Sequence, residues 1–314
     1  SGLIWCYMGT RQVPPPIPGI EFNTLPDEYC YTPSCMLEQN NFIQGIEGDL
    51  DTSHIDYVHS RLHIEPITHP NPAIRGFFSH DRAPKLEICP TDYGAFYAGK
   101  RRWHEGENNI WYRITQYMFP FWTQIAAGDP TRMSNRCWVP LDDEHTMQWG
   151  VQWHPFRELA DRGPRLGLGV HKPHQHGKMF ANSWPEAEVE NDFKIDREVQ
   201  RTRNYTGIET IPLQDAAMTV TMGRIMDRTK EHLATSDGMI FSTRRRLIRA
   251  AVALREQGVT PPCVDTPELY KVRSCSVTLP DGLDWQTALS DWHNARIYEL
   301  PKDRIDPTRN FAER

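Results

Sequence analysis

The chain has 314 residues, of which 39% are hydrophobic and 24% are charged, a composition typical of globular proteins with enough apolar material for a sizeable core. The formal net charge of −6 and the pI near 6.1 argue against a partner such as nucleic acid or an anionic membrane. No stretch approaches the ~18 apolar residues of a membrane span, and the length suggests one large domain or two smaller ones.

Seven cysteines are scattered along the chain, at positions 6, 30, 35, 89, 137, 263 and 275. They form no Cys-x-x-Cys pair, and their number is odd. We expect reduced thiols in a cytoplasmic protein. The chain therefore carries no iron–sulfur or zinc-ribbon ligand set of its own.

The N-terminal residues are expected to lead into the main domain. The apolar run 2–9 lacks the basic start of a signal peptide and is predicted to be a β-strand. No methionine opens the chain, so the natural N-terminus is expected to lie upstream. The proline-rich residues 10–37 are interpreted as an extended connector, and residues 41–60 as a strand or turn that runs into a short helix.

Strand-like segments follow, rich in aromatic and β-branched residues and separated by Gly, Pro, Asp and Asn. They comprise residues 85–89, 93–102, 110–119, 137–140 and 147–153. Because no helix intervenes between them, they predict an antiparallel sheet. Residues 155–206 are polar and are expected to form loops.

The segment from Gly238 to Gln257 is predicted to be a long helix. Its apolar residues suit one buried stripe, namely Met239, Ile240, Leu247, Ile248, Ala251 and Leu254. Gly258 ends the helix, and the run 244–246 of three arginines is interpreted as its solvated face. With a further strand expected in the tail, 263–314, the predicted fold class is α+β: an antiparallel sheet covered by a long C-terminal helix.

The pattern Asp51-x-x-His54-x4-His59 is the most informative for chemistry. The two histidines are about 140° apart around an ideal helix. They can bind one metal ion only if the helix ends or bends between them, or if the ion lies at its edge, and a third ligand must come from elsewhere. The alternative is a pair of surface histidines. The neighbouring acid favours the metal site, because carboxylates commonly orient ligating imidazoles.

Three ordered blocks resemble the catalytic domain of Rieske non-haem iron oxygenases, especially the group of phthalate dioxygenase and the aryl-ether O-demethylases. The blocks are Asn41 to His59; Asn191 to Glu198 with 205–208 and 214–216; and Met222 to Leu233 with 235–237 and 244–247. The resemblance implies a helix-grip fold, like that of START domains. It also implies that residues 1–37 are the return strand and linker from a missing Rieske domain, and that 38–314 form the mononuclear iron domain.

The same resemblance implies that His54 and His59 bind mononuclear Fe(II) together with one carboxylate, leaving three coordination positions open. The family's carboxylate precedes the last long helix, so Asp237 is the expected third ligand. The alternative for Asp237 is the N-cap of that helix. Asp227 is the second choice.

Asp51 matches the family's bridging aspartate, which implies a catalytic part: it would link a ligand histidine to a Rieske-cluster histidine of the neighbouring subunit. The alternative is a plain acid at a helix N-terminus. Arg113, on an aromatic-rich strand, and Arg82 are candidates for binding a substrate carboxylate, although each could equally be a surface arginine.

Two further groups of residues have a common structural interpretation beside a functional one. Trp111, Tyr117, Phe119, Phe121 and Trp122 either wall an aromatic pocket or, more commonly for such residues, pack in the core. His171, His174 and His176 are expected to lie in a solvated loop.

The implied activity is that of an oxidoreductase that uses dioxygen to hydroxylate or O-demethylate an aromatic acid or aryl ether. Electrons would come from NAD(P)H through a reductase or ferredoxin and a Rieske [2Fe–2S] centre, in a cytoplasmic homotrimer or hexamer with no nucleic-acid or membrane partner. Two alternatives are a non-catalytic helix-grip module that binds a small molecule, and a zinc hydrolase, although no H-E-x-x-H motif supplies its general base.

Overall fold

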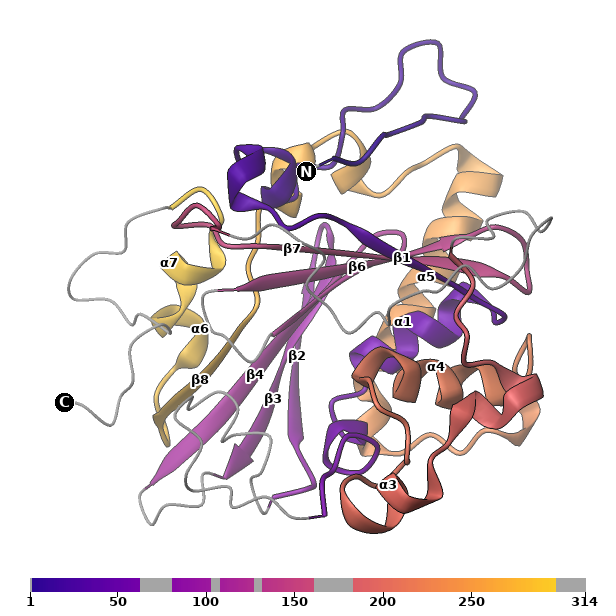
Figure 1. The fold of residues 1–314 in the computed structure, drawn as a ribbon. Coiled ribbons are helices and arrows are strands. Elements are labelled where there is room, and N and C mark those ends of the chain that lie inside the picture. Colours follow the sequence, from indigo (N-terminus) through magenta and orange to yellow (C-terminus); the bar gives the residue numbers. More distant parts are fainter. Residues whose placement is uncertain (1, 63–80, 103–107, 127–131, 161–182, 298–314) are drawn as a thin grey trace.

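The computed structural model describes residues 2–62, 81–102, 108–126, 132–160 and 183–297. Figure 1 shows a curved sheet with helices α1, α4 and α5 on one side and the small helices α6 and α7 on the other. Within the described residues the strands follow the order β1-β7-β6-β5-β4-β3-β2, and β8 pairs with β4. All pairings between named strands are antiparallel, which confirms the predicted α+β class.

The strands are β1 (Ser34–Glu38), β2 (Lys85–Thr91), β3 (Gly94–Arg102), β4 (Asn109–Met118), β5 (Trp122–Ala126), β6 (Met133–Pro140), β7 (Thr146–Trp153) and β8 (Cys275–Pro280). The helices are α1 (Phe42–Leu50), α3 (Arg197–Thr202), α4 (Ile211–Thr221), α5 (Gly238–Gln257), α6 (Trp285–Ala288) and α7 (Ser290–His293). The five predicted strands correspond to β2, β3, β4, β6 and β7, and β8 lies in the tail as expected. Strands β1 and β5 were not predicted from the sequence.

The two faces of the sheet bury different partners because side chains alternate along a strand. On β3, Tyr97 donates its hydroxyl to the Leu50 carbonyl at 2.8 Å, on the side of α1. The next residue back, Phe96, packs edge-on against Trp285 of α6, with ring centroids 5.9 Å apart. The sheet is therefore covered on both faces, and α1 is fixed against the face from which Tyr97 projects.

Helix α5 has the predicted bounds, and Gly258 ends it in the left-handed conformation at φ 69°. The predicted buried stripe is only half right. Met239 and Ile240 are buried, whereas Ile248 and Leu254 are 64% and 53% exposed. The C-terminal half of the helix therefore does not cover the sheet. Among the described residues, no helix is long and apolar enough to cross a membrane.

The arginine run on α5 is not simply a solvated face. Arg244 forms ion pairs with Glu47 and Glu231 at 2.5 Å each, and Arg246 donates to the Thr91 and Gly94 carbonyls at 2.8 and 3.0 Å. Two of the three guanidinium groups thus tie α5 to α1 and to the β2–β3 turn.

The segment before the histidine motif belongs to the same core as the sheet. Residues 2–8 form no regular strand, contrary to prediction. Ile20 and Phe22 are fully buried in the main core, and β1 pairs with β7. A division of the chain between residues 37 and 38 would cut through β1, so it is not a boundary of this sheet.

Glu38, near the end of β1, is 3% exposed and accepts a hydrogen bond from the Asn40 side chain at 2.9 Å. Burial raises its pKa from 4.5 to about 7 despite that bond. The unfolded chain therefore loses this proton at lower pH than the folded chain, so stability falls as pH rises from 4.5 to about 7. At about 1.4 kcal/mol per pH unit, the loss amounts to about 3 kcal/mol.

Glu38→Gln removes this ionisation. We expect the stability of the variant relative to wild type to improve by up to about 3 kcal/mol between pH 4.5 and pH 8, measured by urea denaturation at a series of pH values. Parallel stability curves for the two proteins would contradict the assignment of this pH dependence to Glu38.

Candidate metal centre

The histidine motif begins where α1 ends. The helix starts after Asn41, whose side chain accepts the Ile43 N–H at 3.1 Å, and it ends at Leu50. The Asp51 carboxylate then accepts the N–H groups of Ser53 and His54 at 2.7 and 3.2 Å, which turns the chain into a short 3₁₀ turn over His54–Asp56. The helix therefore ends before the first histidine, which fulfils the condition for both to face one ion.

Arg101 of β3 anchors this loop to the sheet. Its guanidinium donates to the Thr52 carbonyl at 2.5 Å and to Asp56 Oδ2 at 2.9 Å, and the side chains of Arg101 and Asp56 are 0% and 3% exposed. Gly99 permits the close approach, since a Cβ there would lie 3.0 Å from Thr52 Cγ2. A buried ion pair thus fixes the loop that carries both histidines.

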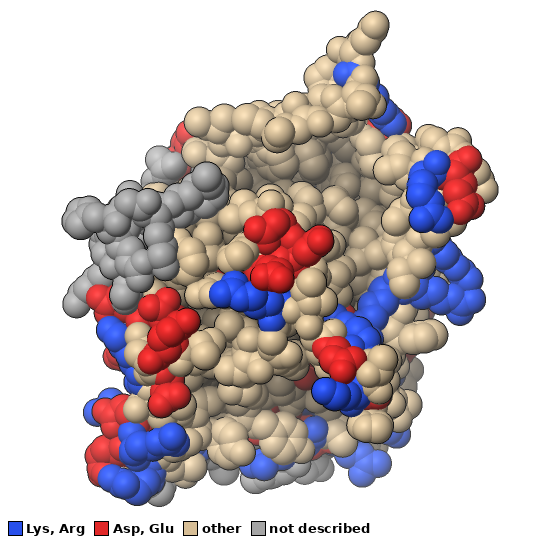
Figure 2. All heavy atoms as spheres, turned by 90° about the vertical axis from the view of Figure 1, so that its right-hand side faces the viewer, with Lys and Arg blue, Asp and Glu red and all other residues tan. Residues whose placement is uncertain are grey.

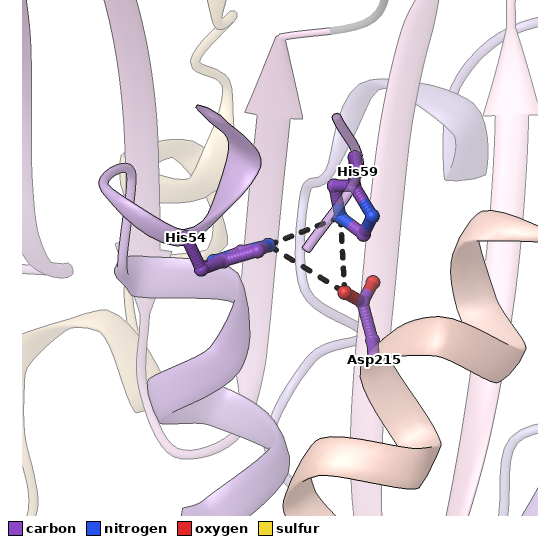
Figure 3. Close-up of side chains that lie close together, drawn as sticks. All are labelled: His54, His59 and Asp215. Carbon is purple, nitrogen blue, oxygen red and sulfur yellow. Dashed lines mark hydrogen bonds and ion pairs between the residues drawn. The ribbon is translucent and has the colours of Figure 1, made fainter. Parts of the chain in front are cut away.

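Helix α4 supplies the carboxylate that meets them. Pro212 lies in its first turn, as is common at helix starts, and Asp215 follows in the second turn. Asp215 Oδ1 lies 3.0 Å from His59 Nε2 and 3.5 Å from His54 Nε2, and the two Nε2 atoms are 3.1 Å apart (Figure 3). Among the described residues, these three side chains form the one group of His, Cys, Asp or Glu that could hold a metal ion.

The donor set fits a non-haem iron centre. Three ligands on one face of an octahedron, each about 2.1 Å from the ion, lie about 3 Å from one another, close to the separations in this group. Two imidazole nitrogens and one carboxylate oxygen are also the ligands of the facial triad of non-haem Fe(II) oxygenases.

The prediction of Asp237 as the third ligand is corrected, because Asp215 and not Asp237 converges with the two histidines. Asp237 occupies the N-cap position of α5, but its Oδ2 turns back to accept the Ala234 N–H at 2.7 Å. Asp227 likewise accepts the Thr229 N–H at 3.1 Å. Both carboxylates are used in local turns before α5, whereas the carboxylate that meets the two histidines comes from the preceding helix, α4.

Each imidazole has a different partner on its second nitrogen. His59 Nδ1 lies 2.7 Å from Gln214 Oε1, and the Gln214 amide nitrogen donates to the Ile208 carbonyl at 2.8 Å, which fixes the orientation of the amide. His54 Nδ1 lies 3.6 Å from Asp51 Oδ2. Such contacts hold each ring with Nε2 toward Asp215.

The electrostatics of the group favour positive charge. Burial by itself lowers the pKa of His54, but the carboxylates of Asp215 and Asp51 outweigh it and raise that pKa to about 9. Burial raises the pKa of Asp215, yet its contacts with His54 and His59 hold that pKa well below its usual range. A proton or a metal cation can therefore be stabilised between these side chains.

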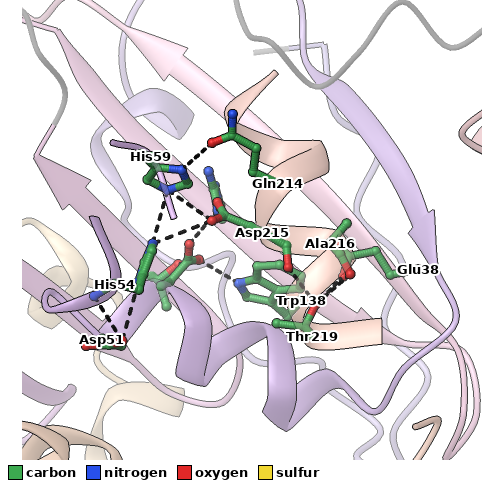
Figure 4. A network of polar contacts seen from close by, with 12 residues as sticks. Glu38, Asp51, His54, His59, Trp138, Gln214, Asp215, Ala216 and Thr219 are labelled. Atoms are coloured by element: carbon green, nitrogen blue, oxygen red, sulfur yellow. Dashed lines mark hydrogen bonds and ion pairs between the residues drawn. The ribbon is translucent and has the colours of Figure 1, made fainter. Parts of the chain in front are cut away.

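A polar network continues behind Asp215 into the core (Figure 4). Arg136 of β6 lies 2.6 Å from Asp49 Oδ1 and 3.5 Å from Asp215 Oδ2. Asp49 Oδ2 accepts from Thr123 Oγ1 at 2.6 Å and from Trp138 Nε1 at 2.7 Å. The Asp215 carboxylate is thus connected to β5, β6 and α1 through side chains that are almost fully buried.

A cavity of about 370 Å³ adjoins the group and is lined by all three of its residues. Its apolar wall includes Ile55, Ile125 and Pro212, and arginines 113, 132 and 136 also line it. Arg113 is 5% exposed, and its NH1 lies 3.5 Å from Thr52 Oγ1. Its Nε atom has no hydrogen-bond partner among the residues that the structure describes. Burial lowers the pKa of Arg113, so an anion in the cavity would meet a poorly compensated cation.

The other candidates lie elsewhere. Arg82 is exposed, with its guanidinium 5.6 Å from the centre of the Tyr57 ring, and it does not line this cavity. The aromatic residues proposed as a wall pack in the protein interior instead. His171, His174 and His176 lie outside the described residues.

A second hollow of about 330 Å³ is also lined by His54 and Asp215. Asp51 contributes to it with a side chain that is 26% exposed, and Val58, Met218, Met222 and Leu233 add apolar surface. Figure 2, which views the molecule from the side of α4 and α5, shows acidic and basic side chains in small mixed groups between broad uncharged areas.

Comparison with known proteins identifies several relatives. Residues 6–304 match the family model described as LigXa C-terminal domain like. The chain is 34% identical to the oxygenase subunit of 3-chlorobenzoate-3,4-dioxygenase from Comamonas testosteroni, over 92% of this chain and 68% of that protein. It is 30% identical to the oxygenase subunit of phthalate 4,5-dioxygenase from Pseudomonas putida, over 81% and 58%.

A third relative is the oxygenase subunit of 5,5'-dehydrodivanillate O-demethylase from Sphingobium sp. strain NBRC 103272 / SYK-6. It is 25% identical over 79% of this chain and 50% of that protein. The chain therefore spans between half and about two thirds of the length of these three relatives.

Proposed function

Because the chain belongs to the LigXa C-terminal-domain family, which supplies the catalytic domain of Rieske-type aromatic oxygenases, we propose that it binds mononuclear Fe(II) through His54, His59 and Asp215. Its activity would be to hydroxylate or O-demethylate an aromatic acid or aryl ether with dioxygen. The convergence of two imidazoles and one carboxylate at separations of 3.0 to 3.5 Å carries this proposal.

Bound iron would supply dioxygen activation, with electrons that come from NAD(P)H through a reductase or ferredoxin and a Rieske [2Fe–2S] centre. The chain's own residues orient the reactants. His54, His59 and Asp215 would hold the ion at the wall of the cavity, which all three residues line. Ile55, Ile125 and Pro212 would contact an aromatic ring and keep bulk water away from it.

Arg113 is the proposed anchor for a substrate carboxylate, because its buried side chain lines the cavity and its Nε has no partner within the described part of the chain. Arg113→Gln is expected to raise KM for an aromatic acid about 10- to 100-fold, as the loss of a charged hydrogen bond implies, while a neutral aryl ether is affected little. Arg82→Gln is the matched control and should leave both KM values unchanged. An equal rise of KM for the acid and the ether would contradict the proposal.

Asp51 is proposed to connect His54 with the Rieske domain of a neighbouring subunit, in a homotrimer or a hexamer of two trimers. Its support is its place beside His54 Nδ1 and its part in the partly apolar hollow. In the assembled oxygenase, Asp51→Asn should leave iron content unchanged and slow electron transfer to the iron, followed by stopped-flow oxidation of the reduced Rieske centre. Transfer at the wild-type rate would contradict it.

Metal analysis of the purified chain tests the proposal as a whole. We expect about one iron per chain; a chain with no metal would indicate a ligand-binding module, and a chain with zinc a hydrolase.

Product analysis tests the activity. With hydrogen peroxide in place of dioxygen and two electrons, an aryl methyl ether should yield a phenol, formaldehyde and water, and an unsubstituted ring edge a cis-diol. Product analysis thus separates O-demethylation from dihydroxylation, and an iron-loaded chain that forms neither product would overturn the activity.

A further inference from the structure

We infer that the buried pair of Asp49 and Arg136 positions the ligand carboxylate of Asp215. This inference rests on the proposed function, because it takes Asp215 as an iron ligand. The two oxygens of Asp215 face different partners: Oδ1 lies toward the imidazoles, and Oδ2 lies 3.5 Å from Arg136 NH1. One guanidinium therefore holds the oxygen that the histidines do not face.

Asp49 in turn fixes the guanidinium. Its carboxylate is 2% exposed and has three donors, Arg136 NH1, Thr123 Oγ1 and Trp138 Nε1, at 2.6 to 2.7 Å. These donors come from the adjacent strands β5 and β6, and Asp49 comes from α1. Arg136 therefore has little freedom to move, and Asp215 is held in one orientation although it belongs to a separate helix.

The pair also balances charge. With Asp49 present, Arg136 is neutralised and a divalent cation at Asp215 meets no net positive charge behind its ligand. Without Asp49, the full charge of Arg136 would repel that cation and compete with it for the Asp215 carboxylate. The sign is therefore defined: loss of Asp49 weakens metal binding, and removal of Arg136 as well restores part of it.

The chain contains a matched control, a second buried acid–arginine pair with a tryptophan donor. Glu21 pairs with Arg273 at 2.5 Å and accepts from Trp153 Nε1 at 2.8 Å, and both charged side chains are fully buried. Neither Glu21 nor Arg273 lines the cavity or the hollow beside the histidines. Glu21→Gln thus disturbs a similar structural pair that has no contact with the ligands.

The experiment titrates the full chain with Co(II), and with Fe(II) under anaerobic conditions, in wild type, Asp49→Asn, the double variant Asp49→Asn with Arg136→Gln, and Glu21→Gln. Affinity and the Co(II) d–d absorption spectrum are recorded at a temperature where circular dichroism shows each protein folded. We expect Asp49→Asn to bind Co(II) about 10- to 100-fold more weakly, as for other partners that orient ligands, with a changed spectrum. The double variant should bind more tightly than Asp49→Asn but less tightly than wild type, and Glu21→Gln should match wild type.

Wild-type affinity and spectrum in folded Asp49→Asn would overturn the inference, and so would a double variant that binds no better than the single one, or an equal loss in Glu21→Gln. If Asp49→Asn does not fold, the double variant, whose buried groups are neutral, is compared with wild type directly, and equal affinity overturns the inference. Failure of wild type itself to bind either metal would instead count against the proposed function.

Discussion

Replacing Asp215 with alanine is expected to remove iron from the chain, whereas replacing Asp237 with asparagine should leave iron content unchanged. Asp215 supplies one of the three atoms that could hold the ion, and two imidazoles alone rarely retain a metal in an otherwise open site. The Asp237 carboxylate is occupied by the Ala234 N–H. The measurement is metal content after dialysis, with circular dichroism to verify the fold of each variant.

This pair of variants separates two carboxylates that the sequence alone does not distinguish. Iron retained by folded Asp215→Ala and lost from folded Asp237→Asn would reverse the ligand assignment. Asp215→Ala should also lose oxygenase activity, in proportion to the iron that it loses.

The second large effect concerns stability. Glu21→Gln should lower the free energy of unfolding by about 3–5 kcal/mol, because it leaves the buried charge of Arg273 without its partner. The double variant Glu21→Gln with Arg273→Met should recover most of that loss, since neither side chain is then charged. Urea denaturation monitored by tryptophan fluorescence measures both changes.

The exposed pair of Glu198 and Arg201, with side chains 66% and 70% exposed, provides the comparison, because ion pairs in water contribute little. Glu198→Gln should leave the unfolding midpoint almost unchanged. If Glu21→Gln were equally mild, the buried pair would not be important for the stability of the fold.

Local patterns predicted most of the sheet and both ends of α5. Strand periodicity and turn residues are local properties, and a glycine such as Gly258 shortly after the last periodic residue favours the end of a helix. The histidine motif was also recognisable, since its spacing excludes a shared face on one continuous ideal helix, and the helix indeed ends at Leu50, before both histidines. These features depend on residues that are close together in the sequence.

The proposed third ligand, Asp215, could not be derived from local patterns, because its position depends on how α4 packs against the loop after α1. Gln214 and Asp215 are polar residues in a helix that otherwise buries Pro212, Ala216 and Ala217. A polar pair on the buried side of a helix was the available signal, and the resemblance to the family included these residues only as part of a matching block. The prediction that the whole apolar stripe of α5 is buried was wrong for a related reason: periodicity does not tell how far a helix extends past the sheet that it covers.

The pairing of β1 with β7 decides where the catalytic unit can be separated from what precedes it. A fragment that began at residue 38 would lack β1 and leave the outer edge of β7 unpaired, and an unpaired edge of this kind recruits other chains. It would also lack Glu21, the acid that forms the buried ion pair with Arg273. A fragment that keeps the sheet and this ion pair intact should therefore start before Ile20, which is fully buried in the core, and fusion joints or protease sites tolerated by the fold should be sought upstream of that point.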